Sequence, residues 1–520
     1  MVNVWSLLWA FIVLFVVSTT CVTCTVDGED DRKVYIVYMG AKSDQDVSVQ
    51  SLHLNILEQV FDDDSTSAAE FFVQSYGRSF NGFAAKLTQQ QKQKLAGMQG
   101  IVSVVESKTL KPHTTRSWDF LGFTGKVPRQ PTQESDIIVG MIDTGVWPEL
   151  ESFSDKGLGS PPKKWQGACH NMTCNNKIIG ARYYNSEGSY AIGEDRSPRD
   201  TIGHGTHTAS TVAGAAVIGA SLYGLARGTA RGATPSARIA VYKVCWNFGC
   251  ADHDVLAAFD DAIADGVDVI SISAGGDSAE DYTLDPIAIG SFHAMRAGIL
   301  TSASAGNGGP GRGTASNVAP WLVSVAASTI DRRFVTRMEI GNHKRIMGQS
   351  INTFSTAKNL VPLIYGVGSR SSTNDIGSRS CVFLAPKLVK GKIVLCDEVS
   401  DGTVPLFAGA QGVVMADVYK SDVPHLYPLP ATTISFDDKE YLLRYLNKTR
   451  NPVAKILKSE EVVDETAPNV ASFSSRGPNM ITHDVLKPDV SAPGLAILAA
   501  WSPKGTVSRG DKRSVKYNII

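Results

Sequence analysis

The sequence predicts an α/β protein built on a doubly wound parallel sheet, with a smaller α+β domain before it and a β-rich insert within it. Three observations lead to this prediction. Apolar runs of strand length alternate with helical patterns from about residue 135 to residue 328, which is typical of a parallel sheet covered on both faces. Residues 33–110 carry a shorter mixed pattern, and residues 340–458 are β-rich without the alternation.

The first region is predicted to form strand, helix, strand, helix and strand in that order. The apolar run VYIVYMG is typical of a strand, and apolar residues three and four apart predict a helix at 52–60. An extended stretch follows, with a turn expected at Asn81-Gly82. Thr88 is a candidate N-cap for the second helix, and the polar, proline-containing stretch 111–116 predicts an exposed linker.

The larger region supplies the strands of the predicted parallel sheet. Its strand-like runs are DIIVGMID, ARIAVYKV, VDVISIS, ILTSAS and WLVSVAA. Between them lie helical stretches, and in residues 251–266 four apolar side chains are expected on one face, those of Val255, Leu256, Phe259 and Ile263. Because ligands of open α/β sheets bind at the carboxyl ends of the strands, functional residues are expected there.

Composition and charge narrow the function classes. The 520 residues leave room for about three domains, and 43% hydrophobic with 19% charged residues is ordinary globular composition. Lys plus Arg number 50 and Asp plus Glu number 51, which gives a formal net charge of −1. This balance gives no electrostatic reason to expect a nucleic-acid or acidic-membrane partner.

The amino-terminal segment predicts secretion. Residues 5–17 form a nearly unbroken apolar run that is too short to span a bilayer, and small and polar residues follow it. No Lys or Arg precedes Arg32, so the amino terminus supplies the only positive charge before the run. We interpret residues 1–24 as a cleaved signal peptide with no membrane span; an uncleaved anchor or a buried helix is the alternative.

Cysteine usage agrees with a secreted chain. After the signal, six cysteines fall into three local pairs, which suggests disulfides, although six cysteines allow many pairings and buried free thiols are the alternative. No pair has the CxxC spacing of a zinc site. The six are Cys169, Cys174, Cys245, Cys250, Cys381 and Cys396. Asn171-Met-Thr and Asn447-Lys-Thr are glycosylation sequons that matter only if the chain is secreted.

Two of the residues that could carry chemistry are an acid and an imidazole. Asp143 ends the strand IIVGMID, where a carboxylate can orient an imidazole; a turn-initiating Asp is the alternative. His204 lies in GHGTHTAS, before a small-residue helix predicted at 211–216, and an imidazole can move a proton at neutral pH. The spacing to His207 would also suit a metal pair, but the Glu of the zinc-peptidase motif is missing, so no metal is expected.

The third residue is Asn307, which follows the strand ILTSAS in SAGNGGPG. A side-chain amide there could donate to a developing oxyanion, whereas a lone Asn beside glycines is more often a turn residue. Each of the three motifs is weak alone. Together they place an acid, an imidazole and an amide at predicted strand ends or helix starts of one α/β region.

With IDTGVWPE, GHGTHTAS, ISISAGG, SAGNGGPG, FSSRGPN and KPDVSAPG in this order, the chain resembles the plant (cucumisin-type) subtilisin-like serine proteases over essentially its whole length. The resemblance implies that Asp143 orients the base, that His204 is the base and that Asn307 donates to the oxyanion. It further implies that Ser273-Ala274-Gly275 forms one wall of the groove by β-pairing to a polypeptide substrate. His207 would be structural.

The resemblance also implies a domain organisation. A ferredoxin-like inhibitory propeptide would end with cleavage between His113 and Thr114 and would act as an intramolecular inhibitor. The β-rich insert resembles the protease-associated domain. The implied ranges are 1–24 for the signal, 25–113 for the propeptide, 114–339 and 462–520 for the catalytic domain and 340–461 for the insert. No cofactor is implied, and the protein would be extracellular or in the cell wall.

The family's nucleophile lies in a Ser-Gly-Thr-Ser-Met block that follows a stretch like KYNII, with which this sequence ends. No Gly-x-Ser-x-Gly elbow occurs elsewhere, and Ser474 and Ser475 in FSSRGPN are expected to be structural. We therefore expect a secreted serine endopeptidase, here in a truncated and inactive form without its catalytic serine. The alternatives are a non-catalytic product that inhibits related proteases through its propeptide, and a non-functional fragment.

Overall fold

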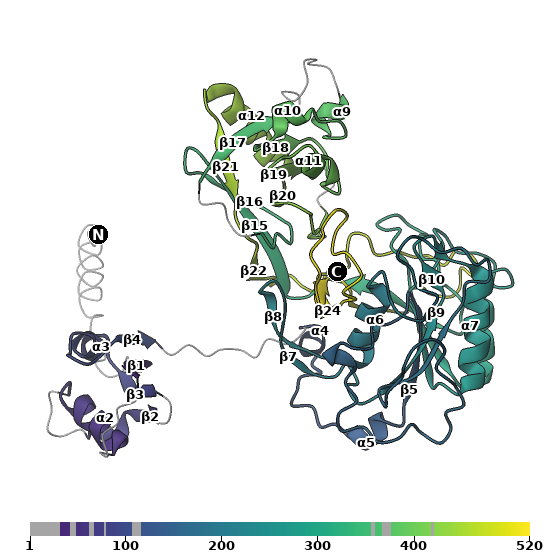
Figure 1. The fold of residues 1–520 in the computed structure, drawn as a ribbon, viewed down its shortest axis with the longest axis horizontal. Helices are drawn as coiled ribbons and strands as arrows, with labels where there is room; N and C mark the ends of the chain where they lie inside the picture. Colours follow the sequence, from purple (N-terminus) through teal and green to yellow (C-terminus); the bar gives the residue numbers. More distant parts are fainter. Residues whose placement is uncertain are drawn as a thin grey trace, which may run out of the picture. The chain divides into compact units, whose positions relative to one another are not determined.

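The computed structural model describes residues 32–41, 48–61, 67–76, 80–106, 116–354, 359–366, 376–417 and 421–520. The chain divides into two compact units, Met1–Lys111 and Pro112–Ile520 (Figure 1). The predicted signal peptide and the predicted cleavage position between His113 and Thr114 lie outside the described residues.

In its described residues, the first unit is an antiparallel sheet with the strand order β2-β3-β1-β4 and the helices α2 and α3. Its βαββαβ sequence of elements and its strand order are ferredoxin-like, as predicted. The elements are β1 (Lys33–Ala41), α2 (Val49–Glu58), the 3₁₀ turn η1 (Ala68–Glu70), β2 (Phe72–Tyr76), β3 (Phe80–Leu87), α3 (Gln89–Ala96) and β4 (Ser103–Glu106).

Two local predictions in this unit had opposite outcomes. Thr88 caps α3 as predicted, because its hydroxyl accepts from the Gln91 backbone N–H while the Gln91 side chain accepts from the Thr88 N–H. The turn predicted at Asn81-Gly82 is wrong, since both residues lie inside β3 and Gly82 pairs with Tyr38. A Cβ on Gly82 would lie 2.6 Å from the Val37 carbonyl oxygen, so this glycine permits close strand approach.

The second unit is built on a seven-stranded parallel sheet with the order β23-β14-β13-β12-β5-β9-β6. Every neighbouring pair in it runs parallel. The five predicted strands all belong to this sheet, whereas β6 was not predicted. The strands are β5 (Ile138–Asp143), β6 (Ile178–Tyr183), β9 (Arg238–Lys243), β12 (Val269–Ile272), β13 (Leu300–Ser304), β14 (Val323–Ser328) and β23 (Val490–Pro493).

Helices cover both faces of this sheet, namely α6 (His204–Ala213), α7 (Asp252–Asp265) and α8 (Pro286–Arg296). Figure 1 shows α7 lying along the strands β9 and β5. Ile142 belongs to the apolar cluster that contains Phe259 of α7, whereas Met141 belongs to the cluster that contains Ala209 of α6. Because side chains alternate along a strand, Asp143 faces the α6 side of the sheet.

The region 332–463 forms a second, mixed sheet, which confirms the predicted β-rich character of residues 340–458 and extends beyond the predicted insert, 340–461, at both ends. Strands β17 to β20 run parallel, and β15 pairs antiparallel with β16, β21 and β22. Its elements are β15 (Arg332–Ile340), β16 (Arg345–Gly348), β17 (Val361–Tyr365), α9 (Ile376–Arg379), α10 (Pro386–Val389), β18 (Ile393–Cys396), α11 (Thr403–Phe407), β19 (Gly412–Ala416), β20 (Ala431–Ile434), α12 (Phe436–Lys448), β21 (Val453–Ile456) and β22 (Glu460–Val463).

Short elements complete the second unit. These are α4 (Ser117–Phe120), α5 (Pro131–Glu134), the 3₁₀ turn η2 (Glu151–Phe153), β7 (Val217–Leu222), β8 (Leu225–Ala230), β10 (Cys245–Trp246), β11 (Gly249–Cys250), β24 (Leu498–Ala500) and β25 (Tyr517–Ile519). The three local cysteine pairs form the disulfides Cys169–Cys174, Cys245–Cys250 and Cys381–Cys396. Within the described ranges, no helix is both long enough and apolar enough to cross a bilayer.

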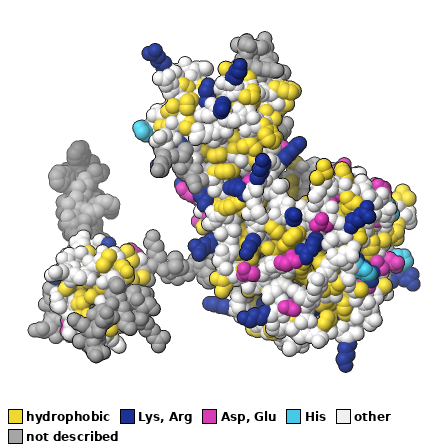
Figure 2. Space-filling model, in the orientation of Figure 1, with side chains coloured by type: hydrophobic (Ala, Val, Ile, Leu, Met, Phe, Trp, Pro, Cys, Tyr) yellow, Lys and Arg dark blue, Asp and Glu magenta, His cyan; other side chains and the backbone are white. Residues whose placement is uncertain are grey.

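Figure 2 shows how charged side chains are distributed on one face of the second unit. Over the part built on the parallel sheet, Lys and Arg lie interspersed with Asp and Glu, whereas the part that carries the mixed sheet shows mainly Lys and Arg.

The packing of α8 against α7 leads to a stability prediction. A Cβ on Gly290 of α8 would lie 2.3 Å from the ring of Phe259, which is fully buried. We expect Gly290→Ala to destabilise the protein by about 1–3 kcal/mol, because the ring or the helix must shift. The measurement is the midpoint of denaturant unfolding. Gly159→Ala, where the new Cβ meets open space, is the control, and equal midpoints for the two variants would contradict the account.

Candidate active site

The parallel sheet brings the predicted site residues to one edge. Strands β5, β12 and β13 are neighbours and run in the same direction, so their carboxyl ends lie side by side. Asp143 is the last residue of β5, Ser273 follows β12 directly, and Asn307 lies three residues beyond β13. His204 begins α6, which contacts β5. The fold therefore gathers residues that are far apart in the sequence.

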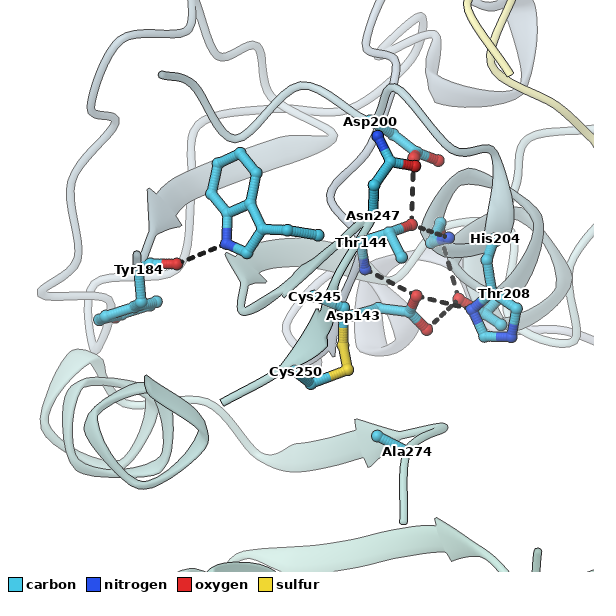
Figure 3. Close-up of a disulfide and its surroundings, with 12 residues drawn as sticks. Asp143, Thr144, Tyr184, Asp200, His204, Thr208, Cys245, Asn247, Cys250 and Ala274 are labelled. Atoms are coloured by element: carbon cyan, nitrogen blue, oxygen red, sulfur yellow. Dashed lines mark hydrogen bonds and ion pairs between the residues drawn. A yellow bond between two sulfur atoms is a disulfide. The ribbon is translucent and has the colours of Figure 1, made fainter. Parts of the chain in front are cut away.

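Asp143 and His204 are in direct contact. His204 Nδ1 lies 2.7 Å from Asp143 Oδ1, and the two side chains face each other in Figure 3. The buried carboxylate also accepts from the Thr144 N–H at 2.7 Å and from the Thr208 hydroxyl at 3.0 Å. Because an ionised carboxylate only accepts, Nδ1 of His204 must carry the hydrogen. This leaves Nε2 of the neutral imidazole free to take up a proton.

The start of α6 differs from the prediction. The small-residue helix expected at 211–216 begins at His204 and ends at Ala213. Gly203, with a φ of 115°, makes the turn into it, and a Cβ there would lie 2.2 Å from the Trp501 ring. A Cβ on Gly205 would lie 2.2 Å from the Gly145 carbonyl oxygen, so glycine is needed on both sides of the histidine.

The two histidines of GHGTHTAS lie in opposite environments. The negative charge of Asp143 raises the pKa of His204 above its usual value of 6.5, and the ring remains 39% exposed. His207 is buried, its Nε2 lies 2.9 Å from the Ile497 carbonyl oxygen, and burial lowers its pKa to about 4. His204 is therefore placed for proton transfer, while His207 is held neutral inside the fold.

Asn307 lies at the exposed tip of a turn that buried serines hold in place. The Gly308 N–H donates to the Ser475 hydroxyl, and the Ser475 N–H donates to the Gly306 carbonyl oxygen, both at 3.0 Å. Ser474 accepts from the Ala327 N–H at 3.0 Å. Both serines are buried and hydrogen-bonded to backbone, so their contacts are structural.

Asn317 ties the segment Ser273-Ala274-Gly275 to the end of β13. The Ala274 carbonyl accepts from the Asn317 amide at 2.8 Å, and the same amide donates to Ser304 at 2.7 Å. Ser273 and Gly275 are exposed.

Sequence reasoning missed several residues that support the site. Thr208 and Asn317 lie in motifs with no local sign of a role, since their partners are distant in the sequence. Asp200 offered a signal, because an Asp shortly before a helix start can accept backbone N–H groups. Among the described residues, no group of three or more His, Cys, Asp and Glu could hold a metal ion.

Comparisons with known proteins identify the family to which the chain belongs. Residues 134–517 match the family described as the subtilase family. The chain belongs to the subtilase family. Residues 34–113, essentially the described part of the first unit, match the family described as peptidase inhibitor I9.

Curated relatives of this subtilase agree with the family match. The chain is 50% identical over 510 residues to subtilisin-like protease SBT4.3 of Arabidopsis thaliana, and the alignment covers 96% of this chain and 69% of that protein. It is 48% identical to SBT4.13 of the same plant, with 99% and 69% covered. Among solved structures, sphericase aligns with 43% of this chain and 57% of its own at 24% identity and a TM-score of 0.27. The predicted resemblance to plant subtilases is thus confirmed.

The contact between Asp143 and His204 leads to a prediction about the pKa of His204. We expect Asp143→Asn to lower the pKa of His204, because the charge that stabilises the imidazolium is removed. With Asp143 present, the folded pKa exceeds the unfolded one, so the added stability is present below about pH 6.5 and disappears as the pH rises through the folded value. NMR of labelled histidines measures the pKa of His204 in both proteins. Asp277→Asn, which removes an exposed acid, is the control, and identical His204 titrations in the unmodified protein and in Asp143→Asn would refute the contact.

His207 predicts a pH dependence of stability on the acid side. Its folded pKa is about 4, below the unfolded value of 6.5, so the unfolded chain binds more protons between these values. The free energy of unfolding should fall by on the order of 3 kcal/mol as the pH drops through this window. His207→Gln retains a donor for Ile497 and does not titrate, so its curve should be flatter. Equal slopes for both proteins would argue against a neutral His207.

Proposed function

We propose that this subtilase is a secreted serine endopeptidase that cleaves polypeptides through an acyl-enzyme. The observation that carries the proposal is the 2.7 Å contact between Asp143 and His204 at the carboxyl edge of a parallel sheet. Asp143 fixes the tautomer that leaves Nε2 free, and its charge stabilises the imidazolium that forms when the base takes a proton. His204 then acts as general base toward a serine hydroxyl and as general acid toward the leaving amine.

Neighbouring loops would bind the substrate and stabilise the negative charge that develops on its carbonyl oxygen. An extended peptide would pair with the backbone of Ser273, Ala274 and Gly275 next to β12. The exposed amide of Asn307 would donate to the oxyanion of the tetrahedral intermediate, and losing such a donor costs roughly 10²–10³ in rate. Its turn is anchored by buried Ser475, which supports a fixed position for the amide.

We further propose that none of the serines in these 520 residues is the nucleophile. Within the part of the chain that the structure describes, no serine hydroxyl is hydrogen-bonded to His204. Ser474 and Ser475 are buried and occupied by backbone contacts, so neither is proposed as the nucleophile. On this proposal, these residues alone would not form the acyl-enzyme, although they supply the base and its carboxylate.

The remaining assignments follow the same proposal. A signal peptide would span 1–24, and a propeptide of 25–113 would inhibit the enzyme until cleavage between His113 and Thr114. The catalytic domain would comprise 114–339 and 462–520, interrupted by a protease-associated insert at 340–461. Asn171 and Asn447 would carry glycans outside the cell or in the cell wall; both side chains are exposed, which supports modification. No cofactor enters this mechanism.

A second candidate function is inhibition of related proteases. The first unit matches the I9 inhibitor family and has an apolar cluster of its own, which includes Val37, Leu57 and Phe83. A chain without a nucleophile could therefore still bind another subtilase through this unit. Inhibition of a purified plant subtilase by the 520-residue chain would support this candidate, and unchanged activity would remove it.

A fluorophosphonate probe tests the catalytic proposal. We expect a chain extended by the coding sequence beyond Ile520, with Ser-Gly-Thr-Ser after KYNII, to be labelled and to hydrolyse peptides. Its His204→Ala variant should lose roughly 10⁴-fold or more in kcat, because the base is gone. The 520-residue chain should not be labelled. Labelling of that chain would contradict the placement of the serine, and an inactive extended chain would contradict the function.

A further inference from the structure

Asp200 is a fully buried carboxylate in the turn before α6, four residues ahead of His204. The mechanism above does not use it. Its two oxygens accept five hydrogen bonds. Oδ1 accepts from the N–H of Ile202 at 2.9 Å, the N–H of Gly203 at 2.8 Å and the hydroxyl of Thr144 at 3.0 Å, and Oδ2 accepts from the N–H and the hydroxyl of Thr206 at 2.9 and 2.6 Å.

The direction of both hydroxyl bonds is settled by their other partners. The Thr144 hydroxyl accepts from the Gly205 N–H at 2.7 Å, and the Thr206 hydroxyl accepts from the Trp147 N–H at 3.1 Å. Each hydroxyl therefore has its own hydrogen left for Asp200. All five groups around the carboxylate are donors, which is the environment of an ionised carboxylate, since a protonated one would have to donate.

These bonds join the two partners of the catalytic contact. Thr144 is the residue next to Asp143 at the end of β5, and Gly203 and Thr206 lie on either side of His204 at the start of α6. The Thr144 hydroxyl bridges the two elements, because it accepts from α6 and donates to Asp200. A shift of the Asp200 carboxylate would thus move the strand end and the helix start relative to each other.

We propose that Asp200 is a positioning residue for His204, whose buried carboxylate locks the first turn of α6 to the end of β5 and so holds the imidazole against Asp143. This inference rests on the proposed function, in which His204 is the base. Asp200 touches neither a substrate nor the imidazole in this role. It acts through Thr144, Gly203 and Thr206.

The charge of Asp200 supplies a readout that a purely structural residue would not. The groups that act electrostatically on the His204 ring are Asp143, Asp200 and His207, and Lys243 of β9 interacts with Asp200 in turn. Asp143 has the largest effect in raising the pKa of His204, and Asp200 acts in the same direction. His207 is buried with a lowered pKa, so it adds no positive charge near neutral pH. Burial raises the pKa of Asp200, and its donors oppose that rise.

The experiment uses the 520-residue chain, so it does not depend on the catalytic serine. Asp200→Asn removes the charge and replaces one acceptor oxygen by a donor. NMR of labelled histidines should show a downward shift of the His204 pKa and loss of the low-field Nδ1–H signal that the contact with Asp143 produces. Asp195→Asn makes the same change on an exposed acid of the same loop and should leave both unchanged. Unchanged His204 signals in folded Asp200→Asn would overturn the proposal.

A second pair of variants decides the case if Asp200→Asn does not fold. Thr206→Val removes one donor and leaves the charge, whereas Thr206→Ser keeps the hydroxyl. We expect the Nδ1–H signal to be lost in Thr206→Val and restored in Thr206→Ser; equal signals in both would overturn the proposal. In the extended chain, Thr206→Val should lower kcat by roughly 10–100-fold with little change in KM, since misplacement of the base affects the chemical step. Absence of hydrolysis in the unmodified extended chain would instead count against the proposed function.

Discussion

The hydrogen bond between the Asp143 carboxylate and the His204 imidazole is the interaction on which the functional account depends. It joins the last residue of a strand to the first residue of a helix, and the two are brought together by the order of strands in the sheet. Neither residue has a chemical role without the other, because the carboxylate decides which ring nitrogen carries the hydrogen. Ser273 and the Asn307 turn follow the neighbouring strands β12 and β13 at the same edge.

Much of the architecture around this contact could be predicted from local sequence. Apolar runs of strand length identified β5, β9, β12, β13 and β14, since buried parallel strands are hydrophobic on both faces. The motifs around Asp143, His204 and Asn307 identified the family, which the comparisons confirm. The N-cap at Thr88 was predictable because its contact with Gln91 joins residues only three positions apart.

The rest could not be predicted, because it depends on contacts between distant residues. Gly82 has the sequence context of a turn, but it lies in β3 because the neighbouring strand approaches closely. The helix α6 begins at His204 rather than later, since Asp200 accepts the backbone N–H groups of Gly203 and Thr206 on either side of this histidine. The Asn317 amide donates to the carbonyl oxygens of Ala274 and Ser304, and no local sequence pattern predicts those hydrogen bonds.

The residues that follow β9 also hold this edge of the sheet in place. The hairpin β10–β11 follows this strand and is closed by the Cys245–Cys250 disulfide, near Asp143 and Ala274 in Figure 3. Its Trp246 is buried and donates to the Tyr184 carbonyl at 2.7 Å. Such packing suits a site in which small displacements of the reacting groups lower the rate strongly. A crystal structure of the protein is the most direct test: we expect a hydrogen bond from the His204 imidazole to the carboxylate at the end of β5, and a separation above about 6 Å would rule out the paired acid and base.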